Sequence, residues 1–286
     1  MGGHMEEFKS FYKEVSGSEG SRCGYNKRLD TYGRGCQHNC SYCYAKSLLD
    51  FRGLWDSEAP AVADPAKIER KIKNLPEGTV LRLGGMTDCF QPLERTQRVT
   101  LETIRLLNKY RIGYLIVTKS DLVADSDYMA AMDKDLAHIQ ITVTCLDDGL
   151  YREKHYENAP PPSKRIAAIW KLQDAGFDVA IRLSPLIPEY MDFEKLNGLG
   201  IEKAVVEFLR VNHWIEQWFD IDTSRYVLKE GNYRHLCLND KKELLKRITI
   251  PSVTVCEDVA LHYDYWKEHV NPDKDDCCNL RKPHAA

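Results

Sequence analysis

Apolar runs alternate with helix-like segments from Lys46 to about Arg210. Each run is continuous, which is typical of strands that are covered on both faces. Such alternation predicts parallel strands joined by right-handed crossovers. The runs are Gly78–Gly85, Gly113–Ser120, Ala137–Cys145, Phe177–Pro185 and Ile201–Arg210. With a short strand around Leu29 to Gly33, they predict about six β-α units, as a doubly wound sheet or a partial barrel.

Three parts of the chain differ in pattern. Residues 1–28 read as a lead-in, and its start "MGGHM" reads as a cloning remnant from Met1 to His4. Residues 29–213 hold the repeated units. From Trp214 the rhythm changes, so we expect residues 214–286 to form an extension packed on the repeated units rather than a separate domain.

Composition narrows the classes of protein. No apolar run reaches the roughly 20 residues of a membrane span, and no secretory signal opens the chain, so we expect a cytoplasmic protein without a membrane partner. The net charge of −3 provides no overall cationic field for nucleic acid, which leaves only a local patch. Ten cysteines exceed what packing requires. Without export, metal ligation explains them better than disulfides.

Three of these cysteines, Cys36, Cys40 and Cys43, fall within eight residues, after the first expected strand. Three thiolates on a four-iron cluster leave one iron without a protein ligand. That iron can take a bidentate ligand, such as the amino and carboxylate groups of an amino acid. The alternative is a zinc knuckle with His38 as fourth ligand, although zinc sites favour paired units.

This spacing resembles that of the radical S-adenosylmethionine superfamily, and most closely the spore photoproduct lyase-like branch. Four motifs carry the resemblance: "GCQHNCSYCYA", "TDCFQPLE", "VTKSD" and "IRLSPLIP". It implies an α/β fold with a partial parallel (β/α)6 TIM-like barrel and a C-terminal extension. It also implies a [4Fe-4S] cluster on the three cysteines, S-adenosylmethionine on the open iron, and an external flavodoxin- or ferredoxin-type reductant.

The resemblance also implies cofactor-binding residues. Tyr42 matches the aromatic that flanks the adenine. Gly84 and Gly85 allow close backbone approach at a strand end, and Thr87 and Asp88 can accept hydrogen bonds. Lys119 ends a strand where an ammonium would pair with the methionine carboxylate, unless it is a solvated lysine.

Two more strands carry polar pairs. Thr142 and Thr144 alternate, so they share one face and could meet the ribose. Arg182 and Ser184 share a face by the same argument. An arginine in an apolar strand needs an anionic partner, and a bound carboxylate would serve.

The match departs from the branch at its hydrogen-donor cysteine, whose place is taken by Gly85 and Met86. Cys89 lies just after Asp88 instead, so these two residues are the catalytic candidates. Either Cys89 donates from a shifted position, or the hydrogen returns from 5′-deoxyadenosine and no thiol donor is needed.

A second group of cysteines lies near the C-terminus, at Cys237, Cys256, Cys277 and Cys278. These thiols are either buried and free or the ligands of an auxiliary iron–sulfur cluster. Cys23 and Cys145 are expected to be buried packing residues.

Function follows from the resemblance. We expect hydrogen abstraction from a nucleobase-linked substrate, a modified thymine in DNA or a modified nucleoside. The reaction would be isomerisation of an amino-acid-decorated thymidine, in the host cytoplasm if the chain is phage-encoded, or lyase-type repair. The stretch Lys241 to Arg247 would touch phosphates or form a solvated helix face. The alternatives are an enzyme that modifies a peptide or small molecule and a non-enzymatic metal-binding module.

Overall fold

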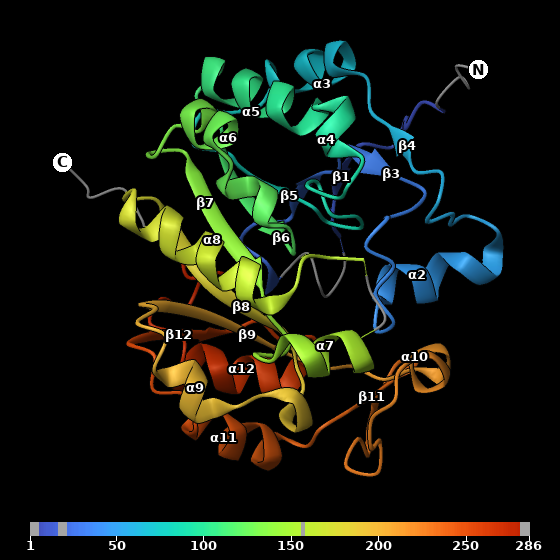
Figure 1. The fold of residues 1–286 in the computed structure, drawn as a ribbon, viewed down its shortest axis with the longest axis vertical. Coiled ribbons are helices and arrows are strands. Elements are labelled where there is room, and N and C mark those ends of the chain that lie inside the picture. Colours follow the sequence, from blue (N-terminus) through green and yellow to red (C-terminus); the bar gives the residue numbers. More distant parts are fainter. Residues whose placement is uncertain (1–5, 17–21, 156–157, 281–286) are drawn as a thin grey trace.

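One open sheet organises the chain, and the fold is an α/β partial parallel barrel (Figure 1). The computed structural model describes residues 6–16, 22–155 and 158–280, so the expected cloning remnant lies outside the described residues. Within this part the sheet has eight strands, in the order β1-β2-β5-β6-β7-β8-β9-β12. All neighbouring pairs are parallel except β1 with β2. Edge strands β1 and β12 do not pair with each other, so the barrel stays open.

The strands lie close to the runs that the sequence predicted. Their bounds are β1 Tyr12–Glu14, β2 Lys27–Leu29, β5 Val80–Leu83, β6 Gly113–Thr118, β7 Ala137–Thr142, β8 Asp178–Leu186, β9 Lys203–Phe208 and β12 Ser252–Val255. Strand β12 was not predicted. It comes from the extension and pairs in parallel with β9, from Ser252 opposite Lys203 to Val255 opposite Val206. The extension therefore lengthens the sheet as well as packing on it.

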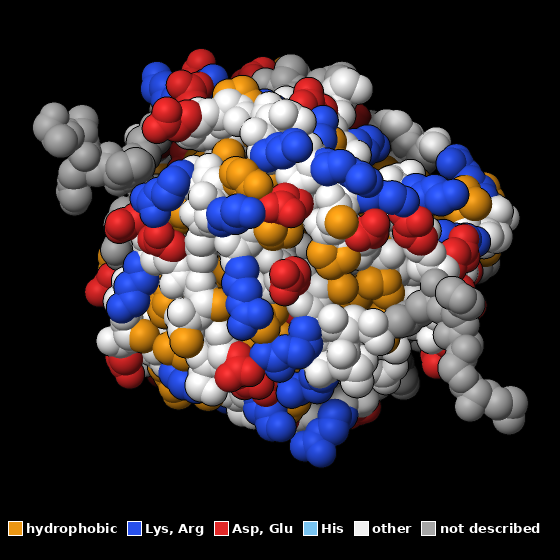
Figure 2. Space-filling view, turned by 90° about the horizontal axis from the view of Figure 1, so that it is seen from above, with side chains coloured by type: hydrophobic (Ala, Val, Ile, Leu, Met, Phe, Trp, Pro, Cys, Tyr) orange, Lys and Arg blue, Asp and Glu red, His pale blue; other side chains and the backbone are white. Residues whose placement is uncertain are grey.

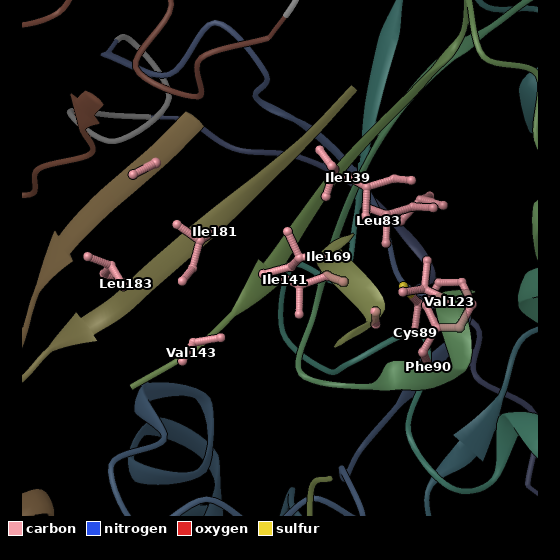
Figure 3. Close-up of a cluster of buried hydrophobic side chains, with 14 of the residues drawn as sticks. Leu83, Cys89, Phe90, Val123, Ile139, Ile141, Val143, Ile169, Ile181 and Leu183 are labelled. Carbon is pink, nitrogen blue, oxygen red and sulfur yellow. The ribbon is translucent and has the colours of Figure 1, made fainter. Parts of the chain in front are cut away.

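Helices cover the outer face of the sheet and bury its apolar side chains. Ile139 and Ile141 of β7 and Ile181 of β8 belong to the same buried cluster as Ile169 of α8 (Figure 3). Helix α8 ends before Gly176, whose φ of 80° is the left-handed conformation that glycine adopts readily. The helices of the barrel part are α2 Tyr44–Leu49, α3 Pro65–Ile72, α4 Glu94–Gln97, α5 Val99–Lys109, α6 Ser126–Ala131, α7 Asp148–Lys154, α8 Pro162–Asp174 and α9 Phe193–Asn197.

The extension adds helices and a hairpin at the β9–β12 end of the sheet. Its elements, with the helix that leads into it, are α10 His213–Trp218, β10 Leu228–Glu230, β11 Tyr233–His235, α11 Leu238–Lys246 and α12 Ala260–His269. Trp266 of α12 is buried and stacks on Phe208 of β9, with ring centroids 6.3 Å apart. A separate two-stranded ladder joins β3 Tyr32–Gly33 to β4 Ala61–Val62. None of the helices in the described ranges is long and apolar enough to cross a membrane.

Candidate active site

A cavity of about 400 Å³ lies at the carboxyl ends of the parallel strands. Its lining includes residues at or just after the ends of β5, β6, β7, β8, β9 and β12. Cys36, Cys40 and Cys43 form part of one wall. In a parallel barrel this end holds the functional loops, so the cysteine group and the strand ends meet where the sequence predicted.

The cysteine loop is held in place by close backbone contacts. A Cβ on Gly35 would lie 1.7 Å from the carbonyl oxygen of Asp56, so no larger residue fits there without a shift of the backbone. Cys36 and Cys40 are each only 8% exposed. The Cys43 sulfur accepts a hydrogen bond from the backbone N–H of Lys46, 3.4 Å away, and so caps helix α2.

The surroundings of these thiols fit an iron–sulfur cluster. Burial and the nearby Asp88 carboxylate together raise the pKa of Cys36 to about 12. Burial also raises the pKa of Cys43. Buried thiolates therefore need a compensating cation, which a bound metal supplies.

The zinc alternative fits less well. Nε2 of His38, its expected fourth ligand, instead lies 3.2 Å from Oδ2 of Asp88. Within the described part of the chain, no three His, Cys, Asp or Glu side chains are arranged to hold a single metal ion. A four-iron cluster spreads its thiolates over separate irons, so this finding leaves the cluster assignment intact.

Tyr42 and Lys119 lie together in the cavity wall. The Lys119 ammonium stands 4.8 Å from the centre of the Tyr42 ring. Tyr42 also packs edge-on against Phe219, with centroids 5.2 Å apart. Among the described residues Lys119 has no ion-pair partner, so its charge is available to a bound anion.

The glycine loop after β5 is fixed by Asp30, which the sequence reading missed. Oδ1 of Asp30 accepts hydrogen bonds from the backbone N–H groups of Gly85 (2.8 Å) and Met86 (3.0 Å). Gly84 has a φ of 83°, and a Cβ there would lie 2.7 Å from the carbonyl oxygen of Val117. Thr87 donates from Oγ1 to the carbonyl of Tyr32 (2.7 Å). The sequence did contain a signal for this role, because Asp30 is a polar residue that directly follows the strand end at Leu29.

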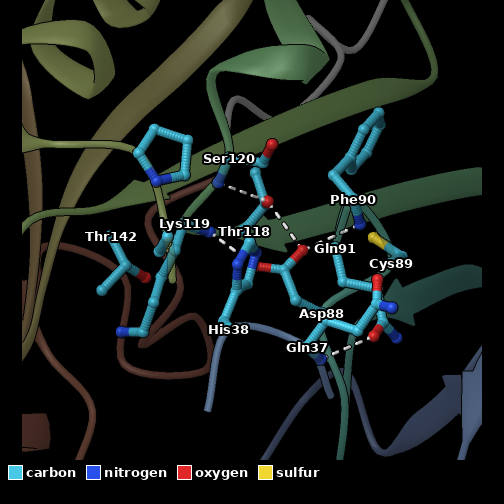
Figure 4. A network of polar contacts seen from close by, with 12 residues as sticks. Gln37, His38, Asp88, Cys89, Phe90, Gln91, Thr118, Lys119, Ser120 and Thr142 are labelled. Atoms are coloured by element: carbon cyan, nitrogen blue, oxygen red, sulfur yellow. Dashed lines mark hydrogen bonds and ion pairs between the residues drawn. The ribbon is translucent and has the colours of Figure 1, made fainter. Parts of the chain in front are cut away.

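Asp88 links three segments of the site (Figure 4). Oδ1 accepts from Thr118 Oγ1 (2.7 Å) and Oδ2 from the N–H of Lys119 (2.7 Å). Burial raises the pKa of Asp88, but His38 and these donors outweigh it, and the net shift is downward. Asp88 therefore holds the cysteine loop against β6. It lines the cavity, yet its oxygens are engaged by the protein.

Cys89 does not line the cavity. Its side chain is fully buried in the hydrophobic core beside Phe90 and Val123 (Figure 3). Burial raises its pKa well above the usual value for a thiol. The expectation that Cys89 donates hydrogen is therefore wrong, because the loop after Asp88 turns this side chain away from the strand ends.

Thr142 and Thr144 do not share a face of the cavity. Thr142 is the last residue of β7 and lines the cavity. Thr144 lies beyond the strand end, is buried, and its Oγ1 has no hydrogen-bond partner in the described residues. The expectation for Thr144 is wrong because the period of two that places both threonines on one face holds only within a strand.

The anionic partner of Arg182 comes from the protein itself. Arg182 is fully buried and donates to Glu207 Oε2 (2.6 Å) and Gln140 Oε1 (2.7 Å). Ser184 Oγ donates to the same Glu207 oxygen (2.7 Å). Arg182 and Ser184 both line the cavity, but the expected bound carboxylate is not needed to pair Arg182. The sequence did contain a signal for this partner, because Glu207 is a charged residue inside the apolar run Ile201–Arg210.

Basic residues that the sequence reading did not single out line a second wall. Arg28 and Arg82 are register partners on β2 and β5, and both line the cavity. Nε of Arg82 is buried without an acceptor in the described residues. Arg210 pairs with Asp258 (2.7 Å).

The C-terminal cysteines lie in two different places. Cys256 and Cys277 line the cavity, and both pack in one buried cluster with Cys278. Cys237 precedes α11, and its thiol donates to Asp240 Oδ2 (3.0 Å), away from the cavity lining. The expectation left Cys237 as an optional member of the group, and the structure places it apart from the other three. Cys23, expected to be a packing residue, lines the cavity instead.

An open parallel barrel with three clustered thiols at the carboxyl ends of its strands is the framework of an iron–sulfur enzyme class. The family model described as "Radical SAM superfamily" matches residues 31–196, more than half of the chain. The protein therefore belongs to the radical SAM superfamily. This family implies a [4Fe-4S] cluster and S-adenosylmethionine, and Cys36, Cys40 and Cys43 are the residues that would hold the cluster.

The curated relatives do not name an activity. The chain is 29% identical over 168 residues to an uncharacterized protein of Methanocaldococcus jannaschii, which covers 57% of this chain and 62% of that protein. It is 25% identical over 198 residues to an uncharacterized protein of Acidianus two-tailed virus, which covers 61% of this chain and 64% of that protein. The matched region spans less than two thirds of each relative.

Solved structures confirm the fold and its likeness to the spore photoproduct lyase branch. Spore photoproduct lyase complexed with dinucleoside spore photoproduct aligns with a TM-score of 0.64 at 15% identity, covering 87% of this chain and 80% of that chain. SuiB of Streptococcus suis bound to S-adenosylmethionine aligns with a TM-score of 0.52 at 13% identity, covering 84% and 52%. At these identities the likeness concerns the fold.

Proposed function

We propose that this chain uses S-adenosylmethionine to abstract a hydrogen atom from a nucleobase-linked substrate, a modified thymine in DNA or the corresponding nucleoside. The observation that carries the proposal is that the cysteine loop and a wall of arginines border the same cavity. The first wall suits the cofactor. The second suits an anionic substrate such as a nucleotide, because guanidinium groups bind phosphate and carboxylate well.

Cys36, Cys40 and Cys43 would hold the cluster, which together with S-adenosylmethionine would supply radical chemistry once an external flavodoxin- or ferredoxin-type protein provides an electron. The protein's residues bind and orient the reactants. Gly84 and Gly85 leave the backbone accessible, and Lys119 presents an ammonium to the methionine carboxylate. Tyr42 and Thr142 border the same space.

The position of Cys89 favours isomerisation over a lyase reaction in which this thiol donates hydrogen. A core thiol cannot reach a substrate radical in the cavity. In an isomerisation, the hydrogen returns from 5′-deoxyadenosine to the product, and no thiol is consumed. Rearrangement of an amino-acid-decorated thymidine is the proposed reaction, with lyase-type repair as the alternative outcome.

The stretch Lys241 to Arg247 cannot act as a whole as a phosphate-binding surface. Lys241 is fully buried and pairs with Glu257 (2.6 Å), so it cannot touch phosphate. On the face over α3, α5 and α6, Lys and Arg side chains are interspersed with Asp and Glu (Figure 2). The proposal places the anion contacts in the cavity itself, first of all at Arg82, whose Nε has no acceptor among the described residues.

Deuterium transfer tests the proposal. Anaerobically reconstituted, reduced protein is given S-adenosylmethionine and thymidine that carries a deuterated amino-acid side chain on its methyl carbon, free or in DNA. We expect deuterium in 5′-deoxyadenosine and in an isomerised product of unchanged mass apart from label exchange. Transfer only from labelled peptides would instead establish the alternative function of peptide modification. Cleavage of S-adenosylmethionine without transfer from any nucleoside would overturn the nucleobase assignment.

A further inference from the structure

Four cysteines from three separate segments meet on the side of the cavity formed by β12 and the C-terminus. They are Cys23 in the lead-in, Cys256 just after β12, and the adjacent pair Cys277 and Cys278. We propose that these four thiols hold a second iron–sulfur cluster. This site does not depend on the proposed substrate, and it differs from the group that spacing alone predicted.

Cys256 is carried to this place by the sheet. Its backbone N–H donates to the carbonyl of Val206 (2.8 Å) and so continues the pairing of β12 with β9. Strand β12 ends at Val255, so Cys256 occupies the carboxyl end of a parallel strand. The strand that the sequence reading missed is therefore the element that positions this thiol.

The adjacent cysteines are fixed from both sides. Thr254 Oγ1 donates to the carbonyl of Cys277 (2.9 Å), and Gln140 Nε2 donates to the carbonyl of Cys278 (2.7 Å). Cys256 packs against the buried cluster that contains Cys277 and Cys278, so β12 and the C-terminal segment bring these three residues together. Cys277 and Cys278 are only 7% and 2% exposed.

Cys23 is brought to the same group by contacts of its chain neighbours with the extension. Arg22 donates from Nη1 to the carbonyl of Asp258 (2.7 Å), and its own carbonyl accepts from Tyr263 Oη (2.8 Å). A Cβ on Gly24 would lie 3.0 Å from the carbonyl of Asp275, so the backbones approach closely on the other side as well. Cys23 lines the same cavity as Cys256 and Cys277.

Positive charge surrounds this group. Arg82 and Arg182 line the same cavity, and Gln140, which donates to the carbonyl of Cys278, accepts from Arg182 (2.7 Å). A cluster with four thiolate ligands carries net negative charge, and burying it requires nearby cations or hydrogen bonds.

The group shares its cavity with Cys36, Cys40 and Cys43. A substrate that enters the cavity would therefore lie between the first cluster with its cofactor and the second cluster. Four thiolates leave no open iron, so the second cluster would act as an electron acceptor or donor near the substrate, without chelating it.

Iron and sulfide stoichiometry tests the site without any substrate. Anaerobic reconstitution of the full chain should give about eight irons and eight sulfides per chain, four of each for each cluster. The C36A/C40A/C43A variant should keep about half, with the Mössbauer spectrum of a four-thiolate cluster. The C256A/C277A variant should also keep about half, with an unchanged far-UV circular dichroism spectrum showing that it folds. C237A, as the matched control, should keep all eight.

The single variant C23S tests whether Cys23 is a ligand of the second cluster. Because Cys23 is partly exposed, the substitution should not disturb the fold. We expect it to lose second-cluster iron or to change the spectrum of that cluster. Full iron with an unchanged spectrum in C23S, or loss of iron in C237A, would overturn the assignment. So would one zinc and about four irons in the wild type, or no iron at all in C36A/C40A/C43A. A failure of the deuterium-transfer experiment would leave these counts unaffected.

Discussion

Arg182 Nη2 lies 2.6 Å from Glu207 Oε2, across the neighbouring strands β8 and β9. Both groups are largely shielded from water, with Arg182 2% and Glu207 23% exposed at their side chains. Burial alone raises the pKa of Glu207, but the Arg182 and Arg210 guanidinium groups outweigh it, and the net shift is downward. This pair fixes one wall of the cavity with charges that belong to the protein.

Replacing one member of the Arg182–Glu207 pair should destabilise the protein more than is expected from its share of the loss when both are replaced. Loss of one partner leaves an uncompensated buried charge, which costs about 3–5 kcal/mol. We therefore expect R182M and E207Q each to lower the free energy of unfolding by about this much. The double variant R182M/E207Q should lose less than the sum, and equilibrium urea unfolding measures all three. Additive losses would show that the two side chains do not stabilise each other.

Removing the Lys119 ammonium should weaken binding of S-adenosylmethionine. A hydrogen bond to a charged group contributes about 1.5–3 kcal/mol, so K119M should raise the Kd at least about tenfold. Anaerobic calorimetry with reconstituted protein measures this directly. K109M is the control, because Lys109 forms a surface pair with Glu69 (2.7 Å) on the outer helices. Equal affinity of K119M and wild type would remove Lys119 from the cofactor site.

Asp30 should position the glycine loop through its acceptor oxygen rather than its charge. Oδ1 alone accepts from the Gly85 and Met86 N–H groups, and an asparagine side-chain oxygen can do the same. We expect D30A to lose about 1–3 kcal/mol of stability, the cost of leaving buried donors unsatisfied, together with affinity for S-adenosylmethionine. D30N should retain most of both. If D30N lost as much as D30A, the negative charge would be the important property.

The expected site residues that do line the cavity are local in sequence. Cys36, Cys40 and Cys43 carry their spacing within one loop, and Lys119 directly follows the last residue of a strand. The continuous apolar runs predicted the central strands for the same reason. Each of these features is decided by residues within about ten positions of one another.

The parts that were missed or wrong depend on which distant residues meet. Nothing within the neighbourhood of Cys23 distinguishes it from Cys237, and only the folded extension selects between them. Arg182 showed that an anion was needed, but Glu207 lies 25 residues further on. The expectation that Thr144 shares a face with Thr142 was wrong because tertiary structure, and not the local pattern, sets the end of β7.

Acid should destabilise the protein through His235, at the end of β11. Burial lowers the pKa of His235 to about 4, and the nearby Lys241 and Arg210 charges contribute to the same shift. The unfolded chain binds this proton below about pH 6.5, whereas the folded protein does not until about pH 4. Stability from His235 is therefore fully present above about pH 6.5 and is lost as the pH falls towards 4. At about 1.4 kcal/mol per pKa unit, the loss reaches about 3 kcal/mol at most.

Urea unfolding of wild type and H235N from pH 7 to pH 4.5 measures this contribution as a difference, so acid effects common to both proteins cancel. We expect a shallower fall for H235N than for wild type. H213N is the matched control, because His213 is exposed and should leave the slope unchanged. Parallel curves for wild type and H235N would show that His235 takes up its proton in the folded state, because the cavity wall around it admits water.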